Sequence, residues 1–205
     1  MPQKIIIVRH GETHYNVERR LQGWADIPLN ENGHEQAQKV AERLSQEAIE
    51  IIYSSDHKRA YETASHIGAK NSLKPLKRKA LRENRMGILE GWQWESEPDP
   101  IKQNLWSERD LAHNRGDTLW KPEGGESLKE HTARVKKFLK QIEIKHKTGV
   151  IMIVSHGGTI NRIMEIYGCK KITDDYVRYK NTSVTILIKN KIGYQLYLHN
   201  DISHL

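Results

Sequence analysis

The sequence has one cysteine, one phenylalanine and no long hydrophobic run among its 205 residues. A single thiol, Cys169, cannot close an internal disulfide, so a disulfide-bonded secreted scaffold is excluded and a reducing, cytoplasmic location is expected. The longest apolar runs, at residues 5–8 and 150–154, are far shorter than the roughly 20 residues that span a bilayer, so no membrane partner is expected. Lys4 precedes only four apolar residues, too few for the core of a secretory signal.

Internal repeats, low-complexity tracts and Pro/Gly/Ser-rich linkers are also missing. A chain of this length can bury about 70% of its unfolded surface, so it needs no disulfide or metal to hold its core. The sequence therefore predicts a single domain over residues 1–205.

The charge balance is basic, with 33 Lys and Arg against 26 Asp and Glu and a formal net charge of +7. Only residues 74–82 and 136–147 are locally basic, and no zinc-finger spacing, Gly-Arg tract or aromatic RNA-binding motif accompanies them. Solvated helix faces and a basic loop explain these segments better than a nucleic-acid footprint, so no nucleic-acid partner is expected. A basic pocket for a small phosphate ester also fits this charge balance.

The first part of the chain predicts strands alternating with helices. A β-branched run at residues 4–8 predicts a buried strand, and Asn30 is expected to cap a helix. The apolar positions of that helix recur at three- and four-residue spacing: Ala37, Val40, Ala41, Leu44 and Ala48. A short strand at residues 50–53 follows, after which three polar residues are expected to cap a second helix: Ser54, Ser55 and Asp56.

The second part of the chain repeats this alternation. Ser127 and Glu130 form a capping box ahead of an amphipathic helix expected at about residues 126–147. An apolar strand at residues 150–154 precedes a further helical pattern, and strands at 183–188 and 194–198 are expected to form a terminal hairpin. This order predicts an α/β three-layer sandwich, with a mainly parallel central sheet and helices on both faces.

Both of the most apolar predicted strands end in a polar turn that carries a histidine. Arg9-His10-Gly11 follows the first, and Ser155-His156-Gly157 follows the later one. Because ligands of α/β sheets bind at the carboxyl ends of the strands, we expect the two imidazoles to meet across one crevice. Arg9 and Arg59 would make this crevice a pocket for a phosphoryl group, and Gly158 opens a helix whose free N–H groups favour an anion.

Six segments carry recognisable residue patterns in a fixed order: residues 9–16, 23–33, 53–64, 81–91, 124–127 and 155–158. They include Arg-His-Gly-Glu-Thr with Asn16, Lys-Arg-Ala, Leu-Arg-Glu, Gly-Gly-Glu-Ser and Ser-His-Gly-Gly. In this order the segments resemble the motifs of the histidine phosphatase superfamily, which includes cofactor-dependent phosphoglycerate mutases and many phosphomonoesterases. A single Arg-His-Gly would be weak evidence, but six ordered segments are hard to obtain by chance.

The resemblance implies a role for each matching residue. It makes His10 the nucleophile that becomes phosphohistidine, Glu83 the proton donor to the leaving oxygen, and a cationic His156 the third catalytic residue. The residues implied to bind the phosphoryl oxygens, besides His156, are Arg9, Asn16, Arg59 and Gly157. Neither a metal nor a cofactor is implied, because guanidinium groups can stabilise the transferring phosphoryl group.

Each of these residues also has a simpler explanation. A histidine at a strand end is often only a hydrogen-bonded polar residue, Asn16 can close a turn, and Glu83 can pair with a neighbouring arginine. His10 and His14 have the i, i+4 spacing of helical metal ligands, but the segment follows a strand and lacks the glutamate of a zinc protease.

Residues 92–121 separate two of the motifs and are rich in tryptophan. By resemblance this segment is a small helical cap inserted over the active site. Its four indoles fit either substrate walls or the packing of a helical subdomain: Trp92, Trp94, Trp106 and Trp120.

The protein is expected to be a phosphomonoester hydrolase. Its substrate would be a small phosphorylated metabolite, and the reaction would pass through a phosphohistidine intermediate. The main alternative is a cofactor-dependent phosphoglycerate mutase, although mutases of the family usually have a longer cap and tail. An alternative of another class is a non-catalytic protein that binds a phosphorylated ligand or serves as a scaffold. The oligomeric state stays open, with a homodimer among the alternatives.

Overall fold

The computed structural model describes residues 1–93, 98–170 and 176–205 of the chain. Its described strands form one six-stranded sheet in the order β3-β2-β4-β1-β5-β6. The strands are β1 (Lys4–Arg9), β2 (Ile49–Ser54), β3 (Leu76–Lys77), β4 (Val150–Ser155), β5 (Val184–Lys189) and β6 (Tyr194–Asp201). Strands β1 to β4 pair in parallel, whereas β5 pairs antiparallel with β1 and β6 pairs antiparallel with β5. The prediction of a mainly parallel sheet is therefore confirmed.

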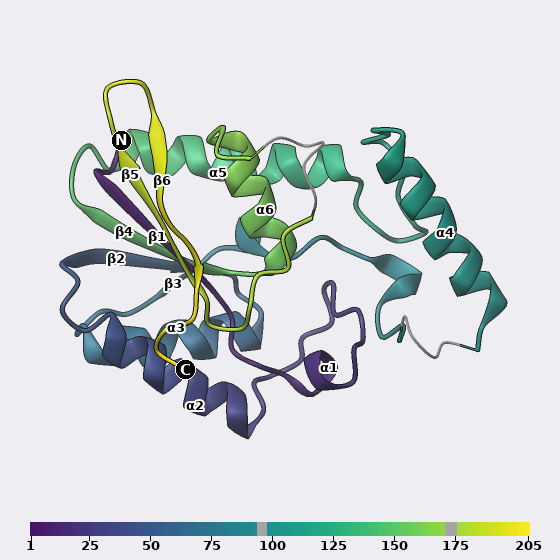
Figure 1. Ribbon diagram of the computed structural model, residues 1–205, viewed down its shortest axis with the longest axis horizontal. Coiled ribbons are helices and arrows are strands. Elements are labelled where there is room, and N and C mark those ends of the chain that lie inside the picture. Colours follow the sequence, from purple (N-terminus) through teal and green to yellow (C-terminus); the bar gives the residue numbers. More distant parts are fainter. Residues whose placement is uncertain (94–97, 171–175) are drawn as a thin grey trace.

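Helices cover both faces of this sheet, which confirms the three-layer architecture (Figure 1). On one face α2 (Glu31–Arg43) and α3 (Lys58–Lys70) lie side by side, and on the other α5 (Leu128–Lys145) packs with α6 (Gly157–Ile166). Two 3₁₀ turns, η1 (Lys79–Leu81) and η2 (Gly87–Leu89), and a single turn α1 (His14–Val17) lie in the connections.

The central strands are buried on both faces because their side chains alternate between two cores. Ile5 and Ile7 of β1 pack with α5 and α6, whereas Ile6 and Val8 pack with α2 and α3. All four side chains are fully buried. A run with no polar residue is therefore what this position in the sheet requires.

Helix α2 begins as predicted but ends earlier. The side chain of Asn30 accepts a hydrogen bond from the N–H of Gly33 at 2.7 Å, which confirms the cap. The helix ends at Arg43, so the assignment of Ala48 to its apolar face is wrong, and Ala48 is exposed. The chain must leave the helix before Ile49, which enters the sheet opposite Val150 of β4.

The cap predicted for α3 is wrong. The N-cap residue is His57, and no side chain of residues 54–56 caps the helix. Instead the first N–H of the helix, from Lys58, donates to Asp26 Oδ1 at 2.7 Å. Asp26 lies 32 positions earlier in the chain, so this cap could not be predicted from local sequence.

The capping box of α5 is confirmed. The Ser127 hydroxyl accepts from the N–H of Glu130, and the Glu130 side chain accepts from the N–H of Ser127 at 2.8 Å. The terminal hairpin of β5 and β6 is also confirmed, and the N–H of Asn190 closes its turn on the carbonyl of Gly193 at 2.8 Å.

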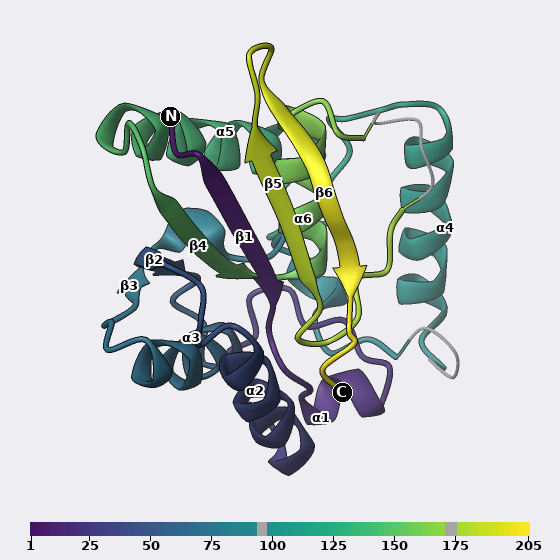
Figure 2. The ribbon, with the colours of Figure 1, turned by 60° about the vertical axis from the view of Figure 1, so that its left-hand side comes forward.

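Helix α4 (Pro100–Asn114) lies within the segment expected to form the cap, and Figure 2 shows it outside the sheet, to the right of β6. Trp92 is buried and stacks on Trp106 of α4 with ring centroids 4.6 Å apart, and the Arg109 guanidinium lies 4.3 Å from the Trp106 ring. These contacts favour the packing interpretation for Trp92 and Trp106. Trp94 lies outside the described residues.

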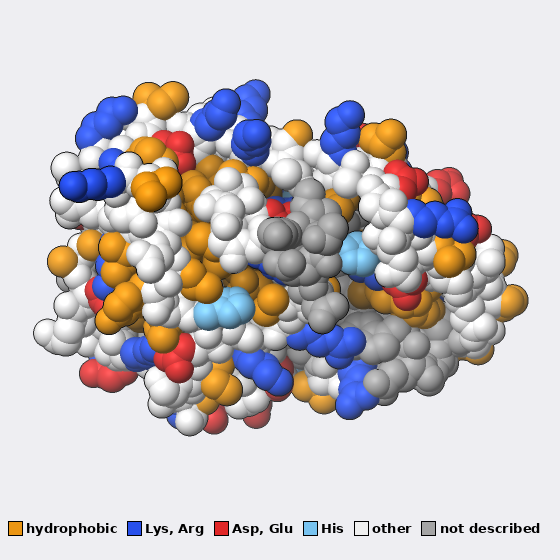
Figure 3. Space-filling view, turned by 45° about the horizontal axis from the view of Figure 1, so that its top comes forward, with side chains coloured by type: hydrophobic (Ala, Val, Ile, Leu, Met, Phe, Trp, Pro, Cys, Tyr) orange, Lys and Arg blue, Asp and Glu red, His pale blue; other side chains and the backbone are white. Residues whose placement is uncertain are grey.

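The basic residues are dispersed on the surface. Lys136, Lys137 and Lys140 are exposed on α5, whose opposite side packs into the core. On the face drawn in Figure 3, Lys and Arg side chains lie in several small groups, with uncharged, apolar and acidic side chains between the groups. No helix within the described residues is long and apolar enough to cross a membrane.

Candidate active site

The two strand-end histidines meet at the carboxyl edge of the sheet. Strands β1 and β4 are parallel neighbours with Arg9 opposite Ser155, and the N–H of His10 donates to the Ser155 carbonyl at 3.0 Å. The rings of His10 and His156 lie with centroids 5.1 Å apart and planes tilted by 59°. Both side chains are buried, at 3% and 1% exposed. The structure thus brings together the two imidazoles as the strand topology predicts.

The ring of His10 is held in one orientation. Its Nδ1 lies 2.7 Å from the carbonyl oxygen of Gly11, so Nδ1 carries the proton and donates, and Nε2 keeps its lone pair. Burial, then the charges of Arg9 and Arg59, hold the pKa of His10 well below its usual value. A neutral imidazole with a free lone pair is the form that can attack phosphorus.

His156 is also neutral, so the expectation of a cationic His156 is wrong. Its Nδ1 accepts a hydrogen bond from Arg59 Nε at 3.2 Å, and Nε2 lies 2.9 Å from the Ser55 hydroxyl. An arginine can only donate, so the ring proton resides on Nε2. Burial and the Arg59 charge keep the pKa of His156 well below its usual value.

Arg59 is fully buried and its guanidinium is fixed by backbone. NH1 donates to the carbonyl of Ala25 at 2.7 Å and NH2 to that of Gly23 at 2.9 Å, in addition to the bond to His156. Burial lowers the pKa of Arg59 to about 10, which leaves it charged at neutral pH. Three of its five N–H groups are used in these bonds, so two can point to an anion.

Arg9 supplies a second cation on the β1 side of the site. One of its terminal nitrogens donates to the carbonyl of Tyr179, while its buried Nε has no hydrogen-bond partner among the residues that the structure describes. Desolvation lowers the pKa of Arg9, and Glu83 and Tyr176 oppose that shift. A half-buried guanidinium whose buried Nε has no partner among the described residues favours an anionic ligand.

Glu83 lies at the N-terminus of α6. Its carboxylate accepts hydrogen bonds from the N–H of Gly158 at 2.9 Å and from the N–H of Asn84 at 2.8 Å. The helix terminus expected to attract an external anion is therefore occupied by this carboxylate, which is a correction to the prediction for Gly158. A Cβ at Gly158 would lie 2.3 Å from Glu83 Oε1, so any larger residue there would displace the carboxylate from this position.

The backbone that carries Glu83 is fixed by side chains from distant segments. Carbonyl oxygens of residues 80–83 accept hydrogen bonds from four of them: Ser155, Thr159, Trp24 and Arg134. These bonds fix the backbone from which the Glu83 side chain reaches the N–H of Gly158.

The neighbouring arginines have other partners. Arg82 forms a bidentate ion pair with Asp56, at 2.8 and 2.7 Å, and lies over the Trp24 ring, as does Arg85. The simpler explanation of Glu83, as a partner of an adjacent arginine, is thus not found among the described contacts.

Asn16 closes the α1 turn, one of the two roles left open by the sequence. Its Oδ1 accepts from the N–H of Thr13 at 3.2 Å and from Asn181 Nδ2 at 3.2 Å. Its Nδ2 donates to none of the residues described by the structure. Gly157 follows His156 at the start of α6, and a Cβ there would lie 3.5 Å from the Tyr176 hydroxyl.

Sequence reasoning missed three side chains of the site. Ser55 directly follows β2, which pairs with β4, and its hydroxyl lies 2.9 Å from His156 Nε2. This neighbour was predictable once the two strands were placed side by side. His57 is 3% exposed with its ring 5.5 Å from that of His156, and burial lowers its pKa to about 4. Tyr176 follows the last predicted motif, and no pattern marked it.

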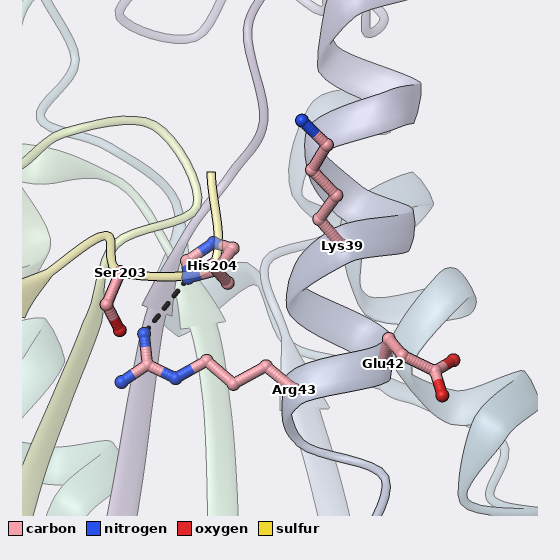
Figure 4. Close-up of a pocket in the computed structure, with 5 residues that line it drawn as sticks. All are labelled: Lys39, Glu42, Arg43, Ser203 and His204. Carbon is pink, nitrogen blue, oxygen red and sulfur yellow. Dashed lines mark hydrogen bonds between the residues drawn. The ribbon is translucent and has the colours of Figure 1, made fainter.

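No group of three or more potential metal ligands occurs among the described residues. His14 is exposed on α1, whereas His10 is buried in the site, so the i, i+4 pair does not face one point. A hollow of about 410 Å³ lies elsewhere, between α2 and the C-terminal tail (Figure 4). Its lining consists of Lys39, Glu42, Arg43, Ser203 and His204.

A family model for the histidine phosphatase superfamily (branch 1) matches residues 5–202. The chain belongs to the histidine phosphatase superfamily. The match spans all six motif segments and confirms the resemblance inferred from them.

Relatives within the histidine phosphatase superfamily carry both mutase and phosphatase names. Phosphoglycerate mutase-like protein 4 of Arabidopsis thaliana is 38% identical over 98% of this chain and 86% of its own length. A metal-independent phosphoserine phosphatase of the same plant is 34% identical over 98% of this chain and 83% of its own. The structure of a mycobacterial glucosyl-3-phosphoglycerate phosphatase in complex with VO3 has a TM-score of 0.83 and 28% identity, covering 97% of this chain and 98% of that one.

Proposed function

We propose that this histidine phosphatase superfamily member hydrolyses a phosphomonoester of a small metabolite through a phosphohistidine on His10. One observation carries the proposal: His10 presents the lone pair of a neutral Nε2 beside two charged guanidiniums, Arg9 and Arg59. The phosphatase names of two relatives support hydrolysis as the reaction.

In the first step His10 Nε2 attacks phosphorus, and the bond from phosphorus to the ester oxygen breaks. The leaving oxygen takes a proton from Glu83, which must enter this step protonated. In the second step water gives a proton to the Glu83 carboxylate and its oxygen attacks phosphorus. The bond from nitrogen to phosphorus breaks, and inorganic phosphate and neutral His10 are released.

The charge of the transferring group is stabilised by fixed donors. Two guanidiniums, His156 and the amide of Asn16 are the groups proposed to bind its equatorial oxygens. The Nε2–H of His156 would exchange the Ser55 hydroxyl, which it contacts at 2.9 Å, for a phosphoryl oxygen. Because Arg59 is already held by the carbonyls of Gly23 and Ala25, it needs no rearrangement to bind the phosphoryl group. We therefore expect turnover without an added divalent cation.

A phosphoglycerate mutase is the second candidate, because the relative with 38% identity is named mutase-like. Both reactions pass through the same phosphohistidine, and they differ in whether water or a second hydroxyl accepts the phosphoryl group. Substrate for either reaction would be a small phosphate ester. We also propose a cytoplasmic location, which suits the single thiol of Cys169.

The decisive experiment incubates the protein, in excess chelator, with a panel of phosphate esters that includes phosphoserine and 3-phosphoglycerate with and without 2,3-bisphosphoglycerate. Free phosphate and isomerised product are both measured, and His10→Ala is the control. Release of phosphate by the wild type alone supports the hydrolase. Isomerised product in excess of phosphate would make the protein a mutase, and tight phosphate binding without turnover would make it a non-catalytic binder.

A further inference from the structure

The turn before β5 contacts the segment that carries His10. The turn is closed by the N–H of Ser183, which donates to the Lys180 carbonyl at 3.0 Å. Thr182 within it is fully buried and has a positive φ of 53°, a strained backbone for a β-branched residue. In this conformation the N–H of Thr182 reaches the carbonyl oxygen of His10, at 3.3 Å.

Asn181, the other central residue of this turn, bridges two segments of the candidate site. Its Nδ2 donates to the His10 carbonyl at 3.0 Å and to Asn16 Oδ1 at 3.2 Å. One side-chain amide therefore contacts both the peptide of the proposed nucleophile and the side chain of a proposed phosphate ligand.

The bond from Asn181 is one of three that set which way the Asn16 amide faces. An amide has an accepting and a donating end that are nearly the same shape, so only its partners decide between two orientations. Asn181 Nδ2 and the N–H of Thr13 both donate to Oδ1, and the Thr13 hydroxyl lies 3.1 Å from the same oxygen. With Oδ1 directed at these donors, Nδ2 is directed away from them.

We propose that Asn181 is a positioning residue that holds the Asn16 amide with its donor toward the phosphoryl group and fixes the His10 peptide at the same time. The inference rests on the proposed role of Asn16 in phosphate binding. Without Asn181, only the N–H and the hydroxyl of Thr13 hold Oδ1 in place, so the Asn16 amide is held less firmly with its donor toward the phosphoryl group.

The C-terminal tail anchors this turn. Arg43 of α2 donates to His204 Nδ1 at 3.0 Å (Figure 4), so His204 carries its proton on Nε2. This Nε2 lies 3.2 Å from the Thr182 hydroxyl. That hydroxyl donates to the carbonyl of Asn181 at 2.8 Å. The chain of bonds fixes the backbone from which the Asn181 side chain reaches the site.

The same turn provides a matched control. Asn200 also holds this part of the chain, with Oδ1 accepting from the N–H of Lys180 in the turn at 2.9 Å and Nδ2 donating to the carbonyl of Arg178, just before the turn, at 3.4 Å. No described hydrogen bond joins Asn200 to His10 or Asn16. Asn200→Ala therefore loosens the turn without removing the bridge.

The test measures the affinity for inorganic phosphate by calorimetry, which requires no turnover, together with kcat/KM where an ester is hydrolysed. Asn181→Ala should weaken phosphate binding about tenfold, and Asn181→Asp more, because a carboxylate cannot donate to Asn16 Oδ1. Asn200→Ala should leave the affinity within about twofold of wild type. Thermal unfolding of each variant reports whether it is folded.

A double-mutant cycle separates positioning from a general loss of structure. Asn16→Ala should weaken phosphate binding about tenfold, and adding Asn181→Ala should cost little more, because the residue it orients is gone. Additive losses, an equal loss in Asn200→Ala, or a wild type that binds no phosphate would each overturn the proposal. A wild type that binds phosphate but hydrolyses no ester overturns the hydrolase alone and leaves this test intact.

Discussion

Arg59 Nε donates to Nδ1 of His156 across 3.2 Å, and this bond decides the protonation of the second histidine. Because the guanidinium cannot accept, His156 Nδ1 is unprotonated and Nε2 carries the hydrogen. The Ser55 hydroxyl lies 2.9 Å from Nε2. His156 therefore enters the site as a neutral donor, and Arg59 and Arg9 supply the positive charge.

The Ser55 hydroxyl should matter for phosphate binding because it fixes the ring of His156. Ser55→Ala leaves Nε2 without this partner, and we expect kcat/KM to fall about tenfold. Ser54→Ala is the control, since Ser54 is equally buried but donates only to the Ser55 carbonyl, at 2.8 Å. Steady-state kinetics on both variants make the comparison, and equal losses would show that His156 does not depend on Ser55.

The nucleophile is tested by trapping the covalent intermediate. His10→Ala should abolish turnover and the acid-labile labelling of the protein by a ³²P-ester, whereas His156→Ala should still be labelled, only more slowly. Rapid acid-free quenching and mass spectrometry of peptides locate the phosphate. Phosphate on His156 of the wild type would reverse the two assignments.

Glu83 is tested through the leaving group. If Glu83 protonates the departing oxygen, Glu83→Gln should slow transfer from alkyl phosphates by about 10²-fold or more. Transfer from p-nitrophenyl phosphate should fall much less, since its leaving oxygen is already stable as an anion.

The rates must be taken from single turnovers, because Glu83 is also the proposed base for the water step and hydrolysis of the phosphohistidine can limit steady-state rates for both substrates. Equal factors for alkyl and aryl esters would make Glu83 a binding residue and require another acid in the site.

Buried neutral histidines should make the fold sensitive to acid. Burial lowers the pKa of four of them: His10, His57, His131 and His156. Between the unfolded pKa of about 6.5 and the folded values, the unfolded chain binds protons that the folded chain does not. The free energy of unfolding should therefore be largest above pH 6.5. It should decrease as pH falls toward 4, by about 1.4 kcal/mol per pH unit for each such histidine.

Urea denaturation at a series of pH values measures this slope. His131→Gln should flatten it, because His131 is buried outside the site, where Nε2 contacts the Thr159 hydroxyl at 2.9 Å. His14→Gln changes an exposed histidine and should leave the slope as it is. The same slope in all three proteins would refute a role for buried histidines in acid sensitivity.

The sheet and its covering helices were predictable because their signals are local. The run at residues 4–8 is apolar on both faces, which is what a central strand between two helical layers requires. The capping box at Ser127 and Glu130 is likewise a contact between residues three apart. The α3 cap was missed because its acceptor, Asp26, comes from a separate loop.

The candidate site divides in the same way. The placement of His10 and His156 follows from two strands ending side by side, so sequence and topology were enough to bring them together. The neutral state of His156 did not follow, because it depends on the direction from which Arg59 approaches the ring. The partner of Gly158 was also missed, since nothing local indicates that Glu83 occupies the end of α6.

The sequence by itself determined the α/β layers, the family and the residue types at the phosphoryl pocket, because periodicity, turn chemistry and ordered motifs are properties of neighbouring residues. Only the tertiary structure decided which donor and acceptor atoms of those residues can bind or attack the phosphoryl group. The tautomers of His10 and His156 and the direction of the Asn16 amide depend on donors and acceptors such as Arg59 and Asn181. Those partners are far away in sequence and meet the site only when the sheet has assembled, so hydrogen bonding across the fold, and not local pattern, sets the chemistry.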